Sequence, residues 1–413
     1  MKSPSIMLIA GEASGDTLAA ELVVALRREL LAREVNGSAD VQPLRTALGP
    51  RFFGAGGSRM AAAGVELAFD MTRHSVIGLT EALKQVAKFR RLMQQLLKLA
   101  RQRQPDVIVC VDFHGFNGRF AAAVRRAVRP QRGTFNNWNP KIVQFVSPQV
   151  WASRSGRVYS MAENLDLLLS IIPFEKDWYA QRVQKLRVEF VGNPIVERHS
   201  NAERGTQTAE QAAPSSTINP PSSRCILLLP GSRPDEVRRH LPLVAETAKR
   251  IAEVAPVEFK AIAPDESLAA SMRTALQGLG ANCRVQVGGI ADALRTADLA
   301  ISKTGTVLME CALFGVPVVA FYKTSWPTYW VGKRIIQLKW ISMPNILAEE
   351  EIYPEFVQGR ATPENLSAAA LELLRNQAHR RAVQARLKAI VASLGEPGAA
   401  RRAARLVCEL LQR

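Results

Sequence analysis

The chain contains 413 residues, with 54 Lys and Arg against 37 Asp and Glu and a formal net charge of +17. Hydrophobic residues make up 47% and aromatic residues 6%, a composition that excludes disordered and fibrous proteins and suits two or three globular domains. The excess of basic side chains indicates an anionic partner: nucleic acid, a membrane surface or a phosphorylated substrate.

Short apolar segments alternate with segments of helical period along most of the chain, which predicts parallel βαβ units. The first strand is expected at residues 6–10, followed by the turn GEASGD (11–16) and a helix from about Thr17. Small residues at such a turn let a ligand approach the backbone, and the turn carries two carboxylates. We therefore interpret it as part of a binding site; the alternative is a simple helix cap made by Ser14 or Asp16.

A second glycine-rich turn, GAGG (54–57), is expected after the next strand. Arg59 occupies the position of the third glycine of GxGxxG, so this turn does not match a dinucleotide-binding fingerprint.

Residues 81–103 have helical period. Lys84, Lys88, Arg91 and Lys98 fall on one stripe, and Leu83, Val86, Met93, Leu97 and Ala100 fall on the other. The segment is either a solvated surface helix or a basic amphipathic element for an anionic lipid surface or a phosphate group. Basic side chains are concentrated in this region, because residues 84–132 contain 12 of them and only two acids.

The motif VDFHGFN (111–117) begins at the end of an apolar strand expected at residues 107–111. Ligands of open α/β sheets bind at the carboxyl ends of strands. Asp112 is therefore a candidate general base for a substrate hydroxyl, and His114 is the second candidate. The structural alternative for Asp112 is a helix N-cap.

Three further motifs follow strands in this half of the chain: SPQVWA (147–152), PFEK (173–176) and VGNP (191–194). The first is expected to form a stiff loop in which polar side chains lie beside a large ring. Residues 200–224 lack a periodic apolar face and are rich in Ser, Thr, Ala and Pro, which predicts a linker or mobile insertion.

After residue 224 the α/β pattern resumes, and two loops suit a diphosphate. LLPGSR (228–233) offers backbone amides and a guanidinium, followed by Glu236. SKTGT (302–306) precedes a helix, and Glu310, one turn into that helix, can reach a ribose diol. Each loop alone is also compatible with an ordinary helix cap; together they favour a nucleotide diphosphate.

The sequence thus predicts an α/β protein with two Rossmann-like lobes and a cleft between them. The first lobe is expected at residues 1–199, the linker at 200–224 and the second lobe at 225–385. Residues 386–413 are expected to form a C-terminal helix that either closes the second lobe or crosses back to the first.

Five dispersed cysteines without a CxxC pair predict buried free thiols in a reducing compartment. The five histidines form no metal-binding pattern, so neither a metal nor a cofactor is expected. No segment approaches the roughly 20 apolar residues that cross a bilayer. Membrane contact is therefore expected to be peripheral, and nucleic acid is disfavoured because base-stacking residues are few among the basic ones.

Taken in chain order, these motifs, with MPNIL at residues 343–347, resemble the lipid-A-disaccharide synthase family over about residues 6–358. The resemblance implies an inverting glycosyltransferase of the GT-B type. Such an enzyme joins UDP-2,3-diacylglucosamine to 2,3-diacylglucosamine 1-phosphate, releases UDP and forms the β(1→6) disaccharide of lipid A. It would work in the cytoplasm, at the inner face of the inner membrane, and its oligomeric state stays open.

The resemblance also assigns residues. Asp112 is the favoured base, although His114 and Gly115 stand where the family has Pro and a second acid, so His114 also remains a candidate. The acceptor side is expected to include Glu12, Ser14, Asp16, Gln149 and Trp151, and the UDP side Gly231, Ser232, Arg233, Glu236, Thr304, Gly305, Thr306, Glu310, Asn345 and Gln358.

Two other functions share part of this pattern. Another GT-B enzyme acting on UDP-N-acetylglucosamine, such as an epimerase or a transferase, would share the second lobe but need no lipid surface. A noncatalytic binder of nucleic acid or anionic lipid would explain the charge but not the two diphosphate loops.

Overall fold

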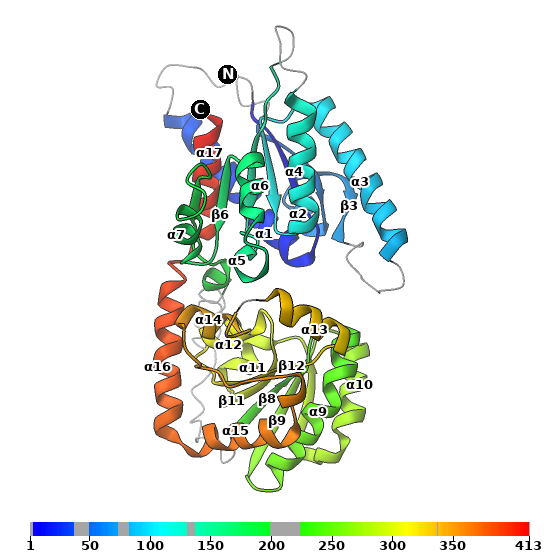
Figure 1. The fold of residues 1–413 in the computed structure, drawn as a ribbon, viewed down its shortest axis with the longest axis vertical. Helices are drawn as coiled ribbons and strands as arrows, with labels where there is room; N and C mark the ends of the chain where they lie inside the picture. The colour runs from blue at the N-terminus through cyan, green and yellow to red at the C-terminus, as the bar shows by residue number, and fades with distance from the viewer. Residues whose placement is uncertain are drawn as a thin grey trace, which may run out of the picture. The chain divides into compact units, whose positions relative to one another are not determined.

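The computed structural model describes residues 3–36, 49–72, 82–129, 137–198, 224–336 and 338–412. They form two compact units. Unit 1 comprises Met1–Pro194 with Gly395–Arg413, and unit 2 comprises Ile195–Leu394. Each unit is a parallel sheet flanked by helices, which confirms the predicted α/β class with two Rossmann-like lobes (Figure 1). The expected insertion at 200–224 lies outside the described residues except for its last residue.

Unit 1 contains a seven-stranded sheet. Its strands are β1 (Ser5–Ala10), β2 (Arg51–Gly56), β3 (Glu66–Asp70), β4 (Val107–Val111), β5 (Lys141–Phe145), β6 (Leu167–Ser170) and β7 (Val188–Phe190). Its helices are α1 (Ala13–Asn36), α2 (Ser58–Ala62), α3 (Ala82–Arg103), α4 (His114–Val128), α5 (Val150–Ser153), α6 (Arg157–Asn164), α7 (Glu175–Ala180) and α17 (Ala399–Leu411). The strand order is β3-β2-β1-β4-β5-β6-β7, and every neighbouring pair is parallel.

Helices cover both faces of this sheet, which explains why its strands are continuous apolar segments. In β1, Ile6 and Leu8 join a core cluster with residues of α1 and α17, whereas Met7 and Ile9 join a second cluster with residues of α3 and α4. All four side chains are fully buried. Successive side chains of the strand therefore point to opposite faces of the sheet and pack in two separate cores.

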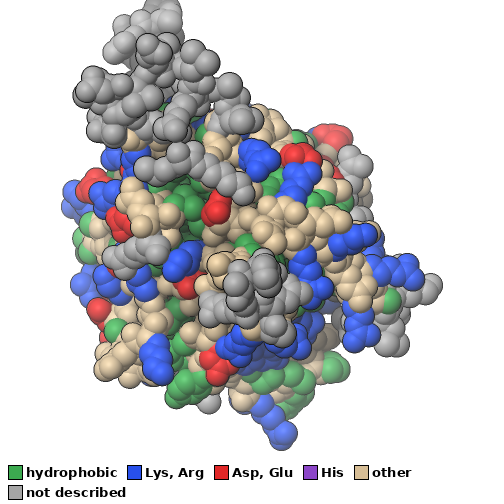
Figure 2. Space-filling model, turned by 90° about the horizontal axis from the view of Figure 1, so that it is seen from above, with side chains coloured by type: hydrophobic (Ala, Val, Ile, Leu, Met, Phe, Trp, Pro, Cys, Tyr) green, Lys and Arg blue, Asp and Glu red, His purple; other side chains and the backbone are tan. Residues whose placement is uncertain are grey.

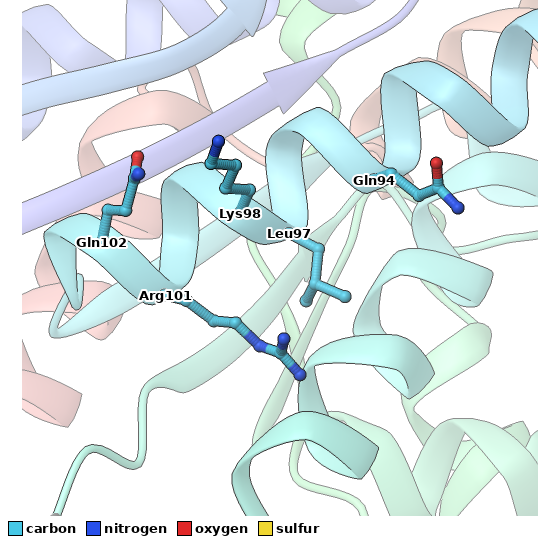
Figure 3. Close-up of a pocket in the computed structure, with 5 residues that line it drawn as sticks. All are labelled: Gln94, Leu97, Lys98, Arg101 and Gln102. Carbon is cyan, nitrogen blue, oxygen red and sulfur yellow. The ribbon is translucent and has the colours of Figure 1, made fainter.

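Helix α3 has an amphipathic arrangement. Leu92, Leu96 and Ala100 form its buried stripe. Ala100 was expected there, whereas the expected Met93 and Leu97 lie one position from the buried leucines and are half-buried. Three members of the predicted basic stripe, Lys88, Arg91 and Lys98, are exposed, and the side chain of Lys84 lies outside the described residues. A surface hollow of about 370 Å³ on this helix is lined by Gln94, Leu97, Lys98, Arg101 and Gln102 (Figure 3). Basic side chains are spread over the face of the molecule in Figure 2, with fewer acidic ones among them.

Unit 2 contains a six-stranded parallel sheet. Its strands are β8 (Arg224–Leu229), β9 (Val257–Ala263), β10 (Cys283–Val287), β11 (Leu299–Lys303), β12 (Val318–Tyr322) and β13 (Glu355–Val357). Its helices are α9 (Pro234–Ala252), α10 (Glu266–Leu276), α11 (Ile290–Arg295), α12 (Val307–Leu313), α13 (Trp326–Ile335), α14 (Met343–Ala348), α15 (Pro363–Arg375) and α16 (Gln377–Ser393). The order β10-β9-β8-β11-β12-β13 repeats the topology of the first six strands of unit 1.

The C-terminal residues are divided between the units. Helix α16 belongs to unit 2, whereas α17 belongs to unit 1 and packs against α1. Ala403, Ala404 and Val407 of α17 are fully buried in the same core cluster as β1. The chain therefore returns to the first lobe, which is one of the two paths that the sequence left open.

All five cysteines are free thiols. The expected burial is confirmed for Cys110, Cys311 and Cys408 and is wrong for Cys225 and Cys283, which are half-buried. Among the described residues, no helix combines the length and apolar character that a membrane span requires.

Candidate active site

In both units the strand order reverses beside the first strand, between β1 and β4 in unit 1 and between β8 and β11 in unit 2. Ala10 pairs with Val111, and Leu229 pairs with Ser302, so the loops that follow these strands start side by side. Ligands of open parallel sheets bind at the carboxyl ends beside such a switch point. The structure therefore brings GEASGD together with VDFHGFN, and LLPGSR together with SKTGT.

The end of β4 carries the two candidate bases. His114 Nε2 lies 3.2 Å from Asp112 Oδ1, and both side chains are about one-third exposed, at 29% and 32%. Burial lowers the pKa of His114, and the charge of Asp112 opposes this shift. The lowered pKa favours the neutral imidazole, which lies against the Asp112 carboxylate without forming a full ion pair.

Two buried amides, which the sequence analysis missed, hold this turn. Asn117 Nδ2 donates to the carbonyl of Asp112 at 2.8 Å, and Gln144 Nε2 donates to the same carbonyl at 3.1 Å. Gln144 Nε2 also lies 3.4 Å from His114 Nδ1 and shares its two N–H groups among this nitrogen and nearby backbone carbonyls. The signal for Gln144 was present in the sequence, because a Gln inside the apolar strand β5 is out of place unless its amide is used.

The GEASGD turn differs from the expectation in detail, because α1 begins at Ala13 and so includes Ser14 in its first turn. Glu12 is half-buried and Ser14 is exposed. The Asp16 carboxylate is buried and accepts backbone hydrogen bonds from Gly57 at 2.7 Å, Arg59 at 3.0 Å and Met60 at 3.1 Å. Asp16 therefore joins the two glycine-rich turns, and its contact with an acceptor stays a prediction.

The loops after β5 and β6 meet around a carboxyl group that the sequence analysis did not select. Glu175 is fully buried, Trp151 Nε1 donates to its Oε1 at 2.9 Å, and the hydroxyl of Ser170 bonds to its Oε2. Burial raises the pKa of Glu175 to about 7, although hydrogen bonds from Ser170, Trp151 and Ser147 oppose the shift. Glu175 thus fixes the indole of Trp151, while Gln149 of the same loop is exposed.

In unit 2 an ion pair connects the two predicted diphosphate loops. Lys303 Nζ lies 3.0 Å from Glu236 Oε1, and Glu236 Oε2 accepts from the backbone N–H of Ser232 at 3.2 Å. Burial opposes ionisation of Glu236, but the hydrogen bond and charge of Lys303 hold the pKa of Glu236 below its ordinary value. Gly231 has φ +140°, and a Cβ there would lie 2.7 Å from Cβ of Glu236, so only glycine fits. Arg233 is exposed beside this turn.

The SKTGT loop (302–306) contributes Lys303 to the ion pair with Glu236. The hydroxyl of Thr304 donates to the carbonyl of Phe321 at 3.2 Å, while Gly305 and Thr306 are exposed. Burial raises the pKa of Glu310 in α12, and Arg198 opposes the shift.

Asn345 and Gln358 have internal partners. The amide of Asn345 is fully buried, donates to Tyr353 O and Glu355 Oε1, and accepts from the N–H groups of Ile352 and Tyr353. Gln358 exchanges two hydrogen bonds with the backbone of Thr324, at 3.0 and 3.1 Å. Both side chains brace loops of unit 2, and their contact with a donor stays a prediction.

Within the described ranges, no three His, Cys, Asp or Glu side chains are grouped as a metal site would require.

Comparison with known proteins gives consistent matches. A family model described as lipid-A-disaccharide synthetase matches residues 6–408. The lipid-A-disaccharide synthase of Myxococcus xanthus is 35% identical over 413 residues, covering 99% of this chain and 98% of its own. That of Nitrosococcus oceani is 34% identical over 416 residues, covering 99% and 97%.

Solved structures share the fold at low identity. The UDP-GlcNAc 2-epimerase of Methanocaldococcus jannaschii has a TM-score of 0.56 at 12% identity, covering 99% of this chain and 100% of its own. The calicheamicin glycosyltransferase CalG4 has a TM-score of 0.55 at 14% identity, covering 100% and 99%.

Two Rossmann-like parallel sheets, each with polar loops at its switch point, define a fold of the GT-B type, which the CalG4 structure shares. The curated relatives are more than 30% identical to this chain over nearly its full length, which shows its family. The chain belongs to the lipid-A-disaccharide synthase family. It is therefore a glycosyltransferase that forms the lipid A disaccharide, and the epimerase and noncatalytic alternatives are not favoured.

Proposed function

We propose that Asp112 is the general base that takes the proton of the acceptor 6-hydroxyl and that His114 positions it. The observation that carries this proposal is the pair at the end of β4, in which His114 Nε2 lies 3.2 Å from Asp112 Oδ1. In this proposal the Gln144 amide, 3.4 Å from Nδ1, donates to that nitrogen, and Nε2–H faces Oδ1 of Asp112, which leaves Oδ2 to accept the substrate proton. His114 lacks a free acceptor nitrogen in this arrangement, which makes it the weaker candidate base.

The reaction then proceeds as one displacement. As Asp112 takes the proton, the acceptor oxygen bonds to the anomeric carbon of the donor from the face opposite UDP. The bond from that carbon to the diphosphate oxygen breaks, and its electron pair leaves with UDP. In this proposal the guanidinium of Arg233 and the ammonium of Lys303 offset the charge that develops on the diphosphate, and Gly231, Ser232 and the 304–306 segment lie against its oxygens. The Glu310 carboxylate would accept from the ribose hydroxyls.

The acceptor would lie at the carboxyl ends of the strands of unit 1, beside Glu12, Ser14, Gln149 and Trp151. Both substrates carry acyl chains in this proposal, which places the enzyme peripherally at the inner face of the inner membrane. The exposed Lys88, Arg91 and Lys98 of α3 supply positive charge for anionic headgroups.

The test follows disaccharide formation by mass spectrometry with UDP-2,3-diacylglucosamine and 2,3-diacylglucosamine 1-phosphate. Asp112→Asn is expected to lower turnover by about 10²-fold to 10⁴-fold while UDP affinity is unchanged. The exposed Asp177→Asn, on α7, is the matched control and should keep wild-type turnover. Near-normal turnover of Asp112→Asn, with strong loss in His114→Gln, would transfer the base role to His114. Absence of disaccharide from the wild-type protein, with UDP-sugar still bound, would refute the proposed reaction.

A further inference from the structure

Helix α13 in unit 2 exposes large apolar side chains. Trp326, Trp330, Val331 and Ile336, on and just after this helix, are exposed by 45–58%. They are four of the nine large hydrophobic residues classed as exposed among the described residues. No residue of α13 is buried. A helix that stabilises its own fold would bury one face, so packing among the described residues does not explain this apolar surface.

The chemistry of this surface is that of a lipid interface. Three of the six Trp residues of the chain lie within residues 326–340, and no acidic residue occurs between Glu310 and Glu349. Cations accompany the rings: Lys333 Nζ lies 5.5 Å from the Trp330 ring centroid, and Lys339 Nζ lies 4.4 Å from that of Trp340. Trp rings beside Lys and Arg are the composition of interfacial helices on anionic bilayers.

Helix α13 follows β12 and starts at the carboxyl ends of the strands of its sheet, where the two predicted diphosphate loops, 228–233 and 302–306, also lie. His240 connects the start of this helix with the first of these loops: its Nδ1 lies 2.8 Å from the carbonyl of Pro230, next to Gly231, and its Nε2 lies 2.9 Å from the carbonyl of Lys323. Gln358 fixes Thr324, one residue further along. The approach to α13 is thus held against the diphosphate loop by buried side chains.

We propose that α13 is an interfacial docking helix that seats unit 2 on a bilayer containing anionic lipids. Trp326, Trp330 and Val331 enter the headgroup boundary, and Lys333 and Arg334 pair with lipid phosphates. The proposal rests on the proposed function, because it explains how a donor that carries acyl chains is taken from the bilayer at the edge where its diphosphate binds. Helix α3 shows no large apolar side chain of comparable exposure in its described part, so it supplies charge without insertion.

The test is co-sedimentation with vesicles of phosphatidylethanolamine and phosphatidylglycerol, and with phosphatidylcholine vesicles as the neutral reference. The double variant Trp326→Ala/Trp330→Ala is expected to lose binding to the anionic vesicles by at least about tenfold. Lys333→Glu/Arg334→Glu is expected to lose about 30-fold or more, in proportion to the charge removed near the surface. Tyr159→Ala is the matched control, because Tyr159 is an aromatic residue of unit 1 that is 64% exposed and lies on another helix, α6. Brominated acyl chains should quench Trp fluorescence in the wild-type protein and much less in Trp326→Phe/Trp330→Phe.

Two measurements separate this proposal from its alternatives. Turnover with short-chain substrates that are monomeric in water should be equal in the wild-type protein and the α13 variants, and turnover with vesicle-borne substrates should fall in the variants. Unchanged vesicle binding in both double variants would overturn the docking role, even if disaccharide forms normally. A lower molecular mass of Trp326→Ala/Trp330→Ala in light scattering, with vesicle binding intact, would instead assign α13 to contact between two copies of the chain. Failure of the wild-type protein to form disaccharide from either substrate set refutes the proposed function separately.

Discussion

Replacing Glu175 by Gln should change how the stability of unit 1 depends on pH. The pKa of Glu175 is raised to about 7, whereas its ordinary value is 4.5. Between these values the folded protein holds a proton that the unfolded chain releases, so the stabilising contribution is complete below pH 4.5 and is lost as the pH rises through 7. At about 1.4 kcal/mol per pKa unit, the full loss amounts to about 3.5 kcal/mol.

The local hydrogen bonds explain why Gln imitates the protonated acid. The hydroxyl of Ser170 lies 2.8 Å from the carbonyl of Ile172 and can donate there, so a protonated Glu175 donates to Ser170 Oγ. In Glu175→Gln the new side-chain amide would donate in the same way, while its oxygen accepts from Trp151. An ionised Glu175 cannot donate. The single hydroxyl hydrogen of Ser170 can then bond either to the Glu175 carboxylate or to the Ile172 carbonyl, but not to both. Tyr179, whose pKa burial raises, is the other titratable group in this cluster.

The assay is thermal unfolding of the wild-type protein and Glu175→Gln between pH 5 and pH 8. At pH 5 the two melting temperatures should be similar, and at pH 8 the variant should be the more stable one by about 3 kcal/mol, which is about 6–12 °C for a domain of this size. Glu163→Gln, at an exposed position of α6, controls for the loss of one carboxylate. Parallel pH profiles of the wild-type protein and Glu175→Gln would refute the reasoning.

Three further substitutions test the other connections in the two sites. Asp16→Ala leaves three backbone N–H groups without their acceptor and should lower the free energy of unfolding by about 3–5 kcal/mol in urea titrations. Asp16→Asn should be less affected, because one side-chain oxygen remains. Equal stability of Asp16→Ala and the wild type would contradict this role. Gly231→Ala should weaken UDP binding at least about tenfold in calorimetry, because its Cβ displaces Glu236, whereas Gly278→Ala, with open space around it, should bind UDP normally. Lys303→Met leaves the half-buried Glu236 without its cation, so UDP affinity should fall by about tenfold and the pKa of Glu236 should rise toward its ordinary value, which the pH dependence of UDP binding would report.

Much of the fold follows from local patterns. The strand predicted at residues 107–111 coincides with β4, and the strand predicted at residues 6–10 differs from β1 by one residue. Buried parallel strands are short, continuous apolar segments, so their positions can be predicted from the sequence without tertiary information. The same patterns placed the polar motifs at strand ends, and topology then required them to meet at the switch points.

The contacts within the sites could not be predicted, because they join residues far apart in the sequence. Asp16 bonds to amides more than 40 positions away, and Lys303 pairs with Glu236, 67 positions away. In α3 the local pattern placed Ala100 correctly on the buried stripe but chose Met93 and Leu97 in place of Leu92 and Leu96. These four side chains are similarly apolar, and only packing on the sheet distinguishes them.

Strain at the end of β4 explains particular residues of the GEASGD and VDFHGFN motifs. Asp112 and Phe113 have φ values of +50° and +44°, a left-handed conformation that costs about 1–3 kcal/mol for each non-glycine residue. The turn is held by the amides of Asn117 and Gln144 on the Asp112 carbonyl, and it directs the Phe113 ring against Gly11, where any Cβ would overlap the ring. The glycine that opens GEASGD therefore accommodates Phe113 and needs no ligand to account for it. The two motifs form one interlocked unit, in which the small residue after β1 permits the backbone turn after β4 that presents the carboxylate of Asp112 at the edge of the sheet.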